Sequence, residues 1–439
     1  MSQPNVMEVN SPQQNVEQNQ NQAAIARKIQ WYVQLYGGPQ PQVFKLNTNC
    51  WDNIFDWLSL EDVLSFGRTC KAFKWVAGEY FKENYPKRRI FCRNGDEPIL
   101  NDFSEYVQII NWTGEITESN AYLLSNCKSL KRIDLFDTTL TESSINTLGS
   151  ALKTVEEISL KLCEFEGRAH EHFVKRCVNL KFLDTYGMAK NRLLQKYSTL
   201  ERLKLVGPVL CDELNRFFKL NPNVRNLTVE GCNVGKIRRY LIDSNIKLDD
   251  LTIEHISERE SDFIDSLNKL HLRGFYKHLH IDLWNSPSKD QLAALQGLVT
   301  LHIHESVLLP SLPNLKELGF HADLTTIRNE GLNVTEIPNL CINLQRLFIL
   351  TTSVDDILPF IRHSPHLVQI EIGWFKEKSI DLQALNKERK NLKGAQKVTI
   401  YVEEYAYLAT KWASTEINVS FITIRRCDSH KVKLAHTLL

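Results

Sequence analysis

The chain has 439 residues, 43% hydrophobic and 24% charged, a composition typical of a soluble protein that folds over most of its length. Its 53 basic residues nearly balance its 52 acidic ones, and a net charge of +1 excludes a global field that would attract nucleic acid or an anionic membrane. No apolar run approaches the roughly 18 residues that cross a bilayer, so we expect a cytoplasmic or nuclear protein without membrane contact.

Two segments of low apolar content open the chain. Residues 1–22 are rich in Gln and Asn, with too little apolar surface to offset the entropy of ordering, and they predict a disordered tail. Residues 23–45 begin with apolar side chains at helical spacing and end in the run Gly37-Gly38-Pro39-Gln40-Pro41. This second segment predicts a short helix followed by a hinge.

Residues 46–85 concentrate large apolar side chains at helical spacing, which predicts a small domain of three short helices. The run Ser59-Leu60-Glu61-Asp62 is typical of a helix start, because the Ser hydroxyl can accept an orphan N–H bond and the acids suit the positive helix end. About forty residues make a small core, so part of this apolar surface is expected to serve a partner.

Residues 86–103 are expected to connect this domain to the rest of the chain. Around them lies a basic group that either meets phosphate or an acidic partner or, as the more ordinary interpretation, forms a solvated face. Its members are Lys82, Lys87, Arg88, Arg89 and Arg93.

From residue 104 to 439 the pattern L-x-x-L-x-L recurs, with an aliphatic or aromatic residue at each of its three fixed positions. Thirteen starts recur every 24 residues on average, within the range of about 20 to 29 that leucine-rich repeats show, and a fourteenth match begins at Val419. The second and third fixed residues should point inward from a short parallel strand. The starts are Val107, Leu130, Val155, Leu180, Leu200, Val224, Leu248, Tyr276, Leu298, Leu315, Leu344, Leu367 and Ala395.

The pattern therefore predicts an α/β solenoid, a leucine-rich-repeat horseshoe of about 13 repeats. Six of the ten cysteines keep fixed places in the repeat, three residues after its third fixed position or three before its first, which favours small, buried and reduced structural thiols. They are Cys163, Cys232, Cys427, Cys127, Cys177 and Cys341.

Catalytic motifs are absent from the sequence: it has no P-loop, no dinucleotide glycine motif, no G-x-S-x-G and no H-E-x-x-H. We therefore expect neither an enzyme nor a cofactor, but a surface that binds a protein. Aromatic and charged residues at the variable repeat positions are candidate anchors for a partner, because such residues dominate binding hot spots. They include Tyr186, Phe348, Phe136, Arg132, Asp134, Phe182, Arg202, Lys204 and Arg346.

Five histidines cluster at variable positions of three successive repeats, where neighbouring strands would place their side chains within touching distance. Three interpretations stay open: tolerated polar surface, which is the most ordinary; a substrate contact that responds to pH below about 6.5; and a metal site, the least favoured because neither a Cys nor a carboxylate pair accompanies them. The five are His278, His280, His302, His304 and His321.

Residues 46–85 resemble an F-box, and the chain after its tail resembles the F-box leucine-rich-repeat family, in particular the cysteine-containing repeat type. The similarity rests on Ile54-Phe55, Trp57-Leu58, Asp62-Val63-Leu64 and Cys70-Lys71 before Phe73. Two places depart from the family pattern, since Asn47 stands where Pro is usual and Trp51 where Leu is usual.

The resemblance implies a substrate-receptor subunit of a Skp–cullin–F-box ubiquitin ligase. In that family the F-box binds the Skp adaptor, the repeats hold a protein substrate, and no group of the receptor touches the reacting atoms. The alternative is a leucine-rich-repeat scaffold whose F-box has drifted and which has no ligase role. Carried over to this chain, the adaptor-facing residues are Leu46, Trp51, Ile54, Phe55, Leu58, Val63 and Leu64.

Overall fold

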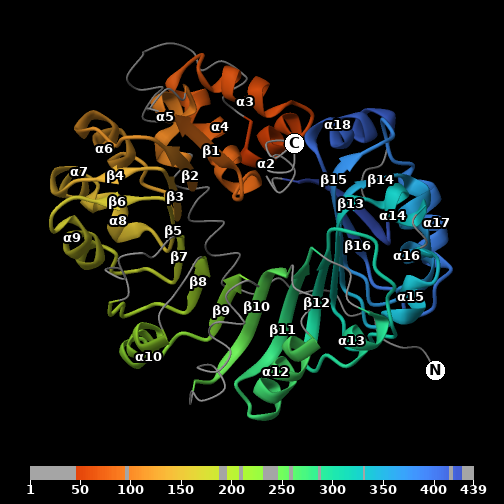
Figure 1. The fold of residues 1–439 in the computed structure, drawn as a ribbon. Coiled ribbons are helices and arrows are strands. Elements are labelled where there is room, and N and C mark those ends of the chain that lie inside the picture. Colours follow the sequence, from red (N-terminus) through yellow and green to blue (C-terminus); the bar gives the residue numbers. More distant parts are fainter. Residues whose placement is uncertain are drawn as a thin grey trace, which may run out of the picture. The chain divides into compact units, whose positions relative to one another are not determined.

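The computed structural model of the chain describes residues 46–93, 98–186, 195–206, 211–230, 246–256, 261–284, 288–329, 332–414 and 419–427 (Figure 1). The chain divides into two compact units, Met1–Asn84 and Tyr85–Leu439, which we call the helical unit and the repeat unit. The predicted tail (1–22) and the predicted helix with its hinge (23–45) lie outside the described residues. Within the described ranges, no helix is long and apolar enough to span a membrane.

The helical unit contains α2 (Thr48–Phe55), α3 (Leu60–Gly67) and α4 (Lys71–Asn84). The predicted cap at Ser59 is confirmed, because its hydroxyl accepts a hydrogen bond from the backbone N–H of Asp62 at 3.1 Å. Asn47 caps α2 in the same way, with its side-chain oxygen 2.9 Å from the backbone nitrogen of Cys50. Both caps satisfy a backbone N–H that the first turn of a helix leaves without a partner.

Aromatic rings form the core of the helical unit. Trp51 packs against Phe55, Phe66 and Phe73, with ring centroids 5.3 to 5.6 Å apart, and the rings of Phe66 and Phe73 lie 4.2 Å apart. Tyr80 of α4 contacts Phe55 and donates a hydrogen bond of 2.8 Å to Asp56. Large rings supply a great deal of apolar contact per residue, which suits a core built from so few residues.

In the repeat unit, the described residues form one sheet of fifteen parallel strands, each paired with its neighbours along the chain. The strands are β1 (Arg89–Arg93), β2 (Ile109–Thr113), β3 (Arg132–Phe136), β5 (Glu157–Lys161), β7 (Phe182–Tyr186), β8 (Arg202–Val206), β9 (Asn226–Glu230), β10 (Leu248–Ile256), β11 (Tyr276–Leu283), β12 (Leu298–Ile303), β13 (Glu317–Asp323), β14 (Arg346–Thr352), β15 (Gln369–Phe375), β16 (Val398–Val402) and β17 (Ile422–Arg426). A second sheet pairs β4 (Thr139–Leu140) with β6 (Glu164–Phe165).

Every predicted repeat start is followed by a strand of this sheet, and the second and third fixed residues are buried as the pattern predicts. In the repeat that begins at Leu130, for example, Ile133 and Leu135 are 1% and 2% exposed. The residues between them face the other side of the strand, as the twofold alternation of a strand requires. The repeat unit is therefore an α/β solenoid of leucine-rich repeats.

Helices link most of the successive strands whose connections are described, and they lie on one side of the sheet (Figure 1). We call the other side, formed by the variable residues of the strands, the open face. The linking helices are α5 (Pro98–Phe103), the 3-10 turn η2 (Ser104–Tyr106), α6 (Glu118–Ser125), α7 (Glu142–Thr147), α8 (Gly149–Thr154), α9 (Ala169–Arg176), α10 (Cys211–Leu220), α12 (Ser261–Leu272), α13 (Lys289–Ala293), α14 (Leu324–Asn329), α15 (Ile337–Leu340), α16 (Val354–His363), α17 (Leu382–Lys390) and α18 (Glu404–Ala413).

The stretch 86–103 differs from the expected connector, because it supplies β1, the first strand of the sheet. Ile90 and Cys92 are buried and pair with Ile110 and Trp112 of β2. The repeat pattern missed this strand because Lys87 stands at its first fixed position. The repeats thus begin one unit earlier than the sequence indicated.

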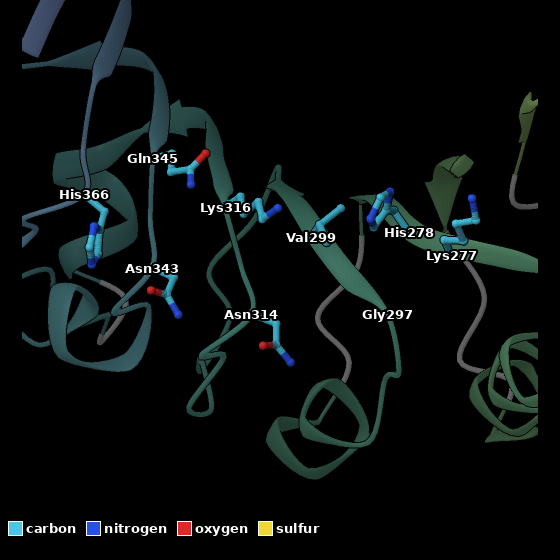
Figure 2. A pocket seen from close by; sticks show the side chains of 9 residues that line it. All are labelled: Lys277, His278, Gly297, Val299, Asn314, Lys316, Asn343, Gln345 and His366. Carbon is cyan, nitrogen blue, oxygen red and sulfur yellow. The ribbon is translucent and has the colours of Figure 1, made fainter. Parts of the chain in front are cut away.

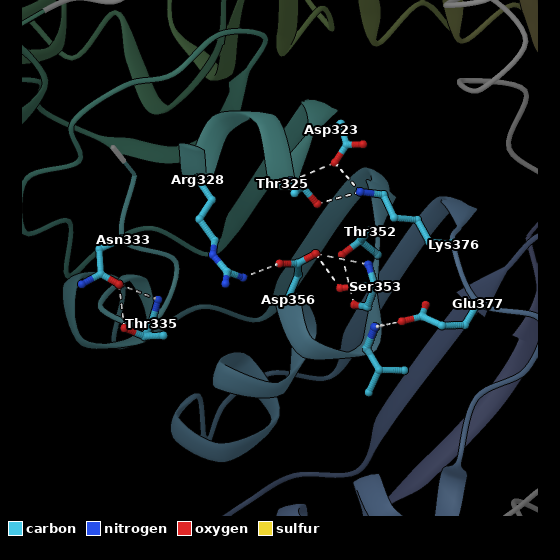
Figure 3. A network of polar contacts seen from close by, with 11 residues as sticks. Asp323, Thr325, Arg328, Asn333, Thr335, Thr352, Ser353, Asp356, Lys376 and Glu377 are labelled. Atoms are coloured by element: carbon cyan, nitrogen blue, oxygen red, sulfur yellow. Dashed lines mark hydrogen bonds and ion pairs between the residues drawn. The ribbon is translucent and has the colours of Figure 1, made fainter. Parts of the chain in front are cut away.

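Polar contacts tie the carboxyl ends of β13, β14 and β15 to α14 and α16, the helices that follow β13 and β14 (Figure 3). Asp323 accepts from the Lys376 ammonium at 2.9 Å and from the backbone N–H of Thr325 at 2.8 Å. Asp356, which is 2% exposed, accepts from the Ser353 hydroxyl at 2.7 Å and from Arg328 at 3.2 Å. These bonds fix the helix starts of consecutive repeats relative to one another.

Candidate functional site

The structure separates the predicted adaptor-facing residues into a buried set and a surface set. Trp51, Phe55, Val63 and Leu64 are at most 5% exposed and hold the helical unit together. The surface set consists of Leu46 and Leu58, which are half-buried, and Ile54, which is 41% exposed.

Trp57 belongs beside this surface set, although the transferred list omits it. Its side chain is 43% exposed and it follows α2, three residues after Ile54. Trp57-Leu58 is the aromatic-Leu pair of the F-box pattern, so the sequence alone could have identified Trp57. We define the apolar rim as Leu46, Ile54, Trp57 and Leu58. The rim thus joins three residues of the predicted set to Trp57, and all four offer apolar surface to a partner.

Both departures from the F-box pattern have a structural role in the helical unit. Asn47 caps α2, a role that a proline side chain could not fill because it has no acceptor oxygen. Trp51 stands at the centre of the aromatic core, in contact with three other rings. Neither departure removes a side chain from the apolar rim.

The five histidines lie on or directly after β11, β12 and β13, and their contacts form two groups, His278 with His280 and His302 with His304 and His321. His278 and His280 of β11 both reach Asp250 of β10, with ring nitrogens 3.1 and 3.2 Å from the same carboxylate oxygen. The other ring nitrogen of His280 lies 2.8 Å from the Thr300 hydroxyl of β12. Each of these rings thus has a fixed partner on a neighbouring strand.

The remaining three histidines are joined by shorter contacts. Nδ1 of His302 lies 2.7 Å from Nε2 of His321, and Nε2 of His302 lies 3.1 Å from Glu317. For this contact to be a hydrogen bond, one of the two nitrogens donates and the other accepts. The ring of His304 stacks on that of His321 at 4.4 Å, nearly parallel.

Other rings extend this stack across the sheet. Trp284, 39% exposed, stacks on His304 at 4.2 Å, and Phe348 of β14 packs against His321 at 4.8 Å. The sequence did not single out Trp284, which follows the last residue of β11. Phe348 was a candidate anchor, but it is only 4% exposed and serves to support the imidazoles.

We call the five histidines the histidine patch, and the carboxyl of Asp282 lies against it. Burial raises its pKa, but the imidazole of His304, 2.7 Å away, and the charges of His321 and His302 outweigh burial and lower it below the ordinary value. A lowered pKa keeps the carboxylate charged among the imidazoles. Across the described ranges, no group of three or more His, Cys, Asp or Glu side chains is arranged to hold a metal ion.

A charged band covers the open face of the earlier strands. Arg132 binds Asp134 at 2.8 Å and Glu157 at 3.1 Å, and Arg202 binds Glu157 at 2.6 Å. The Phe182 ring lies between these two guanidinium groups, 5.7 and 4.9 Å from them. The charges in this band largely neutralise one another, so it offers a partner little unpaired charge.

The other predicted anchors have mixed placements. Arg89 of the basic group lies 3.7 Å from Asp134 and so joins the charged band, and Arg346 contacts Glu317 at 2.5 Å. Lys204 forms an ion pair with Glu254. Phe136 is 46% exposed at the end of β3 and is the most accessible aromatic candidate. Tyr186 ends β7, and its side chain lies outside the described residues.

Among the repeat cysteines, Cys127, Cys177 and Cys341 are buried, and Cys163 and Cys427 are half-buried. Burial raises the pKa of Cys163 to about 11 and those of Cys127 and Cys341 to about 12, and it raises that of Cys177 as well. A raised thiol pKa suppresses the reactive thiolate. These positions therefore suit structural thiols, as the repeat pattern indicates; Cys232 lies outside the described residues.

No protein-family model matches the chain, and no curated protein matches it in sequence. Three solved structures are similar to it: a TLR13–ssRNA13 complex (14% identity, TM-score 0.28), an internalin (inlF) from Listeria monocytogenes (11%, 0.23) and a Drosophila Toll–Spatzle complex (13%, 0.28). They cover 74, 72 and 77% of this chain, which in turn spans 58, 89 and 54% of theirs. The likeness is loose, and the repeats are identified by their strand register instead.

Proposed function

We propose that this chain is a substrate-receptor subunit of a Skp–cullin–F-box ubiquitin ligase. The supporting observation is a unit of three short helices that stands directly before a leucine-rich-repeat solenoid and carries an apolar rim at F-box positions. In this proposal the rim contacts the Skp adaptor, and through it the cullin. The repeat unit binds a protein substrate that has yet to be identified.

Under this proposal the chain works by positioning. Binding a substrate and a ubiquitin-charged enzyme in one assembly turns an encounter between separate molecules into a reaction within one complex, which raises the effective concentration of the substrate lysine. The receptor itself needs no catalytic group. The open face, with its histidine patch and its exposed aromatic side chains, offers the area on which a substrate could be held.

Co-purification with the Skp adaptor tests the proposal. The tagged chain should recover the adaptor, and an Ile54→Ala, Trp57→Ala variant should lose most of it, because both side chains are on the surface. Phe55 is unsuitable for this test, since it is fully buried and its loss would unfold the helical unit. Phe136→Ala, an equally exposed aromatic change in the repeat unit, is the matched control and should bind normally.

The second candidate function is a repeat scaffold without a ligase role, and the same experiment distinguishes the two. If the intact chain recovers no adaptor, the ligase proposal is wrong and the scaffold is favoured. The substrate role of the histidine patch is tested separately with a His280→Ala, His302→Ala variant. Unchanged recovery of proteins that bind the repeat unit would remove the patch from consideration.

A further inference from the structure

A hollow of about 500 Å³ runs along the amino-terminal ends of β11 to β15, beside the open face (Figure 2). Its walls come from five successive repeats. Lys277 and His278 belong to β11, Asn314 and Lys316 precede β13, Gln345 precedes β14 and His366 precedes β15. We call this hollow the edge groove.

The titratable side chains that line the edge groove are all basic. Two lysines, two histidines and three side-chain amides are among its nine lining residues, and none of the nine is acidic. Lys277 and His278 are already paired with Asp249 and Asp250 of β10, at 2.6 and 3.1 Å. Lys316 and His366 are exposed, and neither forms an ion pair with any described residue.

The extent of the groove limits what can occupy it. Neighbouring strands are about 4.8 Å apart, so five strands span about 19 Å, which equals roughly six residues of extended chain at about 3.3 Å each. The lining has no Phe, Tyr or Trp ring. Single-stranded nucleic acid is usually held by stacking on such rings, so the lining favours a peptide.

We propose that the edge groove binds an extended acidic segment of a partner protein, whose carboxylate or phosphate oxygens lie against Lys316 and His366. The side-chain amide of Gln345, from the repeat between these cations, and that of Asn314, from the repeat of Lys316, supply neutral donors beside them. Such an acidic segment would be the substrate class of the receptor proposed above, and the biological meaning of the groove rests on that function. Peptide binding, however, needs no adaptor, so the two proposals can fail separately.

The experiment measures fluorescence anisotropy of labelled eight-residue peptides with the purified full chain. One peptide is rich in Glu, a second carries phosphoserines, and a neutral peptide and an oligouridylate of matched length complete the set. We expect saturable binding of at least one acidic peptide that weakens with added salt, because exposed charges are screened. Lys316→Ala should weaken that binding about tenfold, the usual scale for one hydrogen bond to a charged group.

Lys131→Ala is the matched control. Lys131 holds the equivalent place in the repeat before β3, with the same backbone bonds to its neighbours, but it lies outside the groove. Binding of the Glu peptide supports a carboxylate ligand, and binding of the phosphoserine peptide alone supports a phosphate ligand. Equal binding of the neutral peptide, an unaltered affinity in Lys316→Ala, or tighter and Lys316-dependent binding of oligouridylate would each overturn the inference.

Discussion

At the scale of single residues, the most consequential side chain is one that the sequence hides. Arg389 stands in the run Asn386-Lys387-Glu388-Arg389-Lys390, which reads as a solvated helix face, yet it is 0% exposed. Its guanidinium donates to the backbone carbonyls of Gln396, Ile361, Ser364, Pro365 and Leu367, at 2.7 to 3.2 Å. Burial lowers its pKa to about 10, which leaves it charged at neutral pH.

Replacing Arg389 by Met should therefore destabilise the repeat unit by at least about 3 kcal/mol, because several buried carbonyls would lose their donor at once. Arg362→Met is the control, since that side chain is 44% exposed and its ion pair with Glu388 is screened by solvent, so its loss should change stability little. Urea unfolding compares the two variants. Equal midpoints for both variants would show that the carbonyl contacts of Arg389 do not stabilise the repeat unit.

At the scale of elements, the sequence predicts a strand wherever three fixed apolar positions coincide, because burial on one side of a strand needs that spacing. Each of the fourteen matches, including the weak one at Ala395, places its second and third fixed residues in a strand. Contacts between repeats were only partly predictable. The clustering of the histidines follows from their repeat positions. The register between β11 and β12 shifts next to His280, and this shift sets the partners of His280. No feature of the sequence predicts it.

In the helical unit, packing of α2 against α4 creates a pH dependence. Burial, with the nearby charges of Glu83 and Asp56, raises the pKa of Asp52 from 3.8 to about 6. Between these two values the folded chain holds a proton that the unfolded chain releases, so the stability of the unit falls as the pH rises from about 4 to about 6.

Asp52→Asn should remove this penalty. The rise in the pKa of Asp52 corresponds to about 3 kcal/mol at most, and because Asp52 is half-buried we expect a gain nearer 1 kcal/mol at pH 7.5 and none at pH 4. Hydrogen exchange of the α2 to α4 amides, compared with the unaltered chain at each pH, measures the effect. Glu61→Gln, on the exposed side of α3, is the control. A gain of the same size at both pH values in the Asp52→Asn variant would contradict the assignment.

At the scale of the whole molecule, the net charge is close to neutral, but the surfaces of different strands differ in charge. Opposite charges neutralise each other in the band over β1 to β8, whereas the edge groove of β11 to β15 is cationic and has no acidic side chain in its lining. Exposed apolar side chains occur in both units, with Ile54 and Trp57 in the helical unit and Trp374 and Trp412 among those of the repeat unit. Composition alone excludes a global field but cannot locate such surfaces, since they depend on which repeats become neighbours.

The architecture of the repeat unit also predicts how it unfolds. Leu279 of β11 and Ile422 of β17 are both fully buried, but among the described strands β11 has a neighbour on both sides and β17 pairs with β16 alone. Either change to Ala should cost about 2 to 5 kcal/mol locally. In a solenoid each repeat contacts mainly its neighbours. Arg426 at the end of β17 also reaches the start of the repeat unit, where its guanidinium lies 5.7 Å from the Tyr85 ring. A loss at Ile422, four residues before Arg426, can still be absorbed by local fraying.

We therefore expect Leu279→Ala to lower the urea midpoint of the repeat unit and to speed hydrogen exchange on both sides of β11. Ile422→Ala should speed exchange in β16 and β17 alone and leave the main midpoint nearly unchanged. Comparing the two variants needs no knowledge of the partner. If Ile422→Ala lowers the main midpoint as far as Leu279→Ala does, the fifteen strands unfold as one cooperative block, and coupling along the sheet extends beyond nearest neighbours.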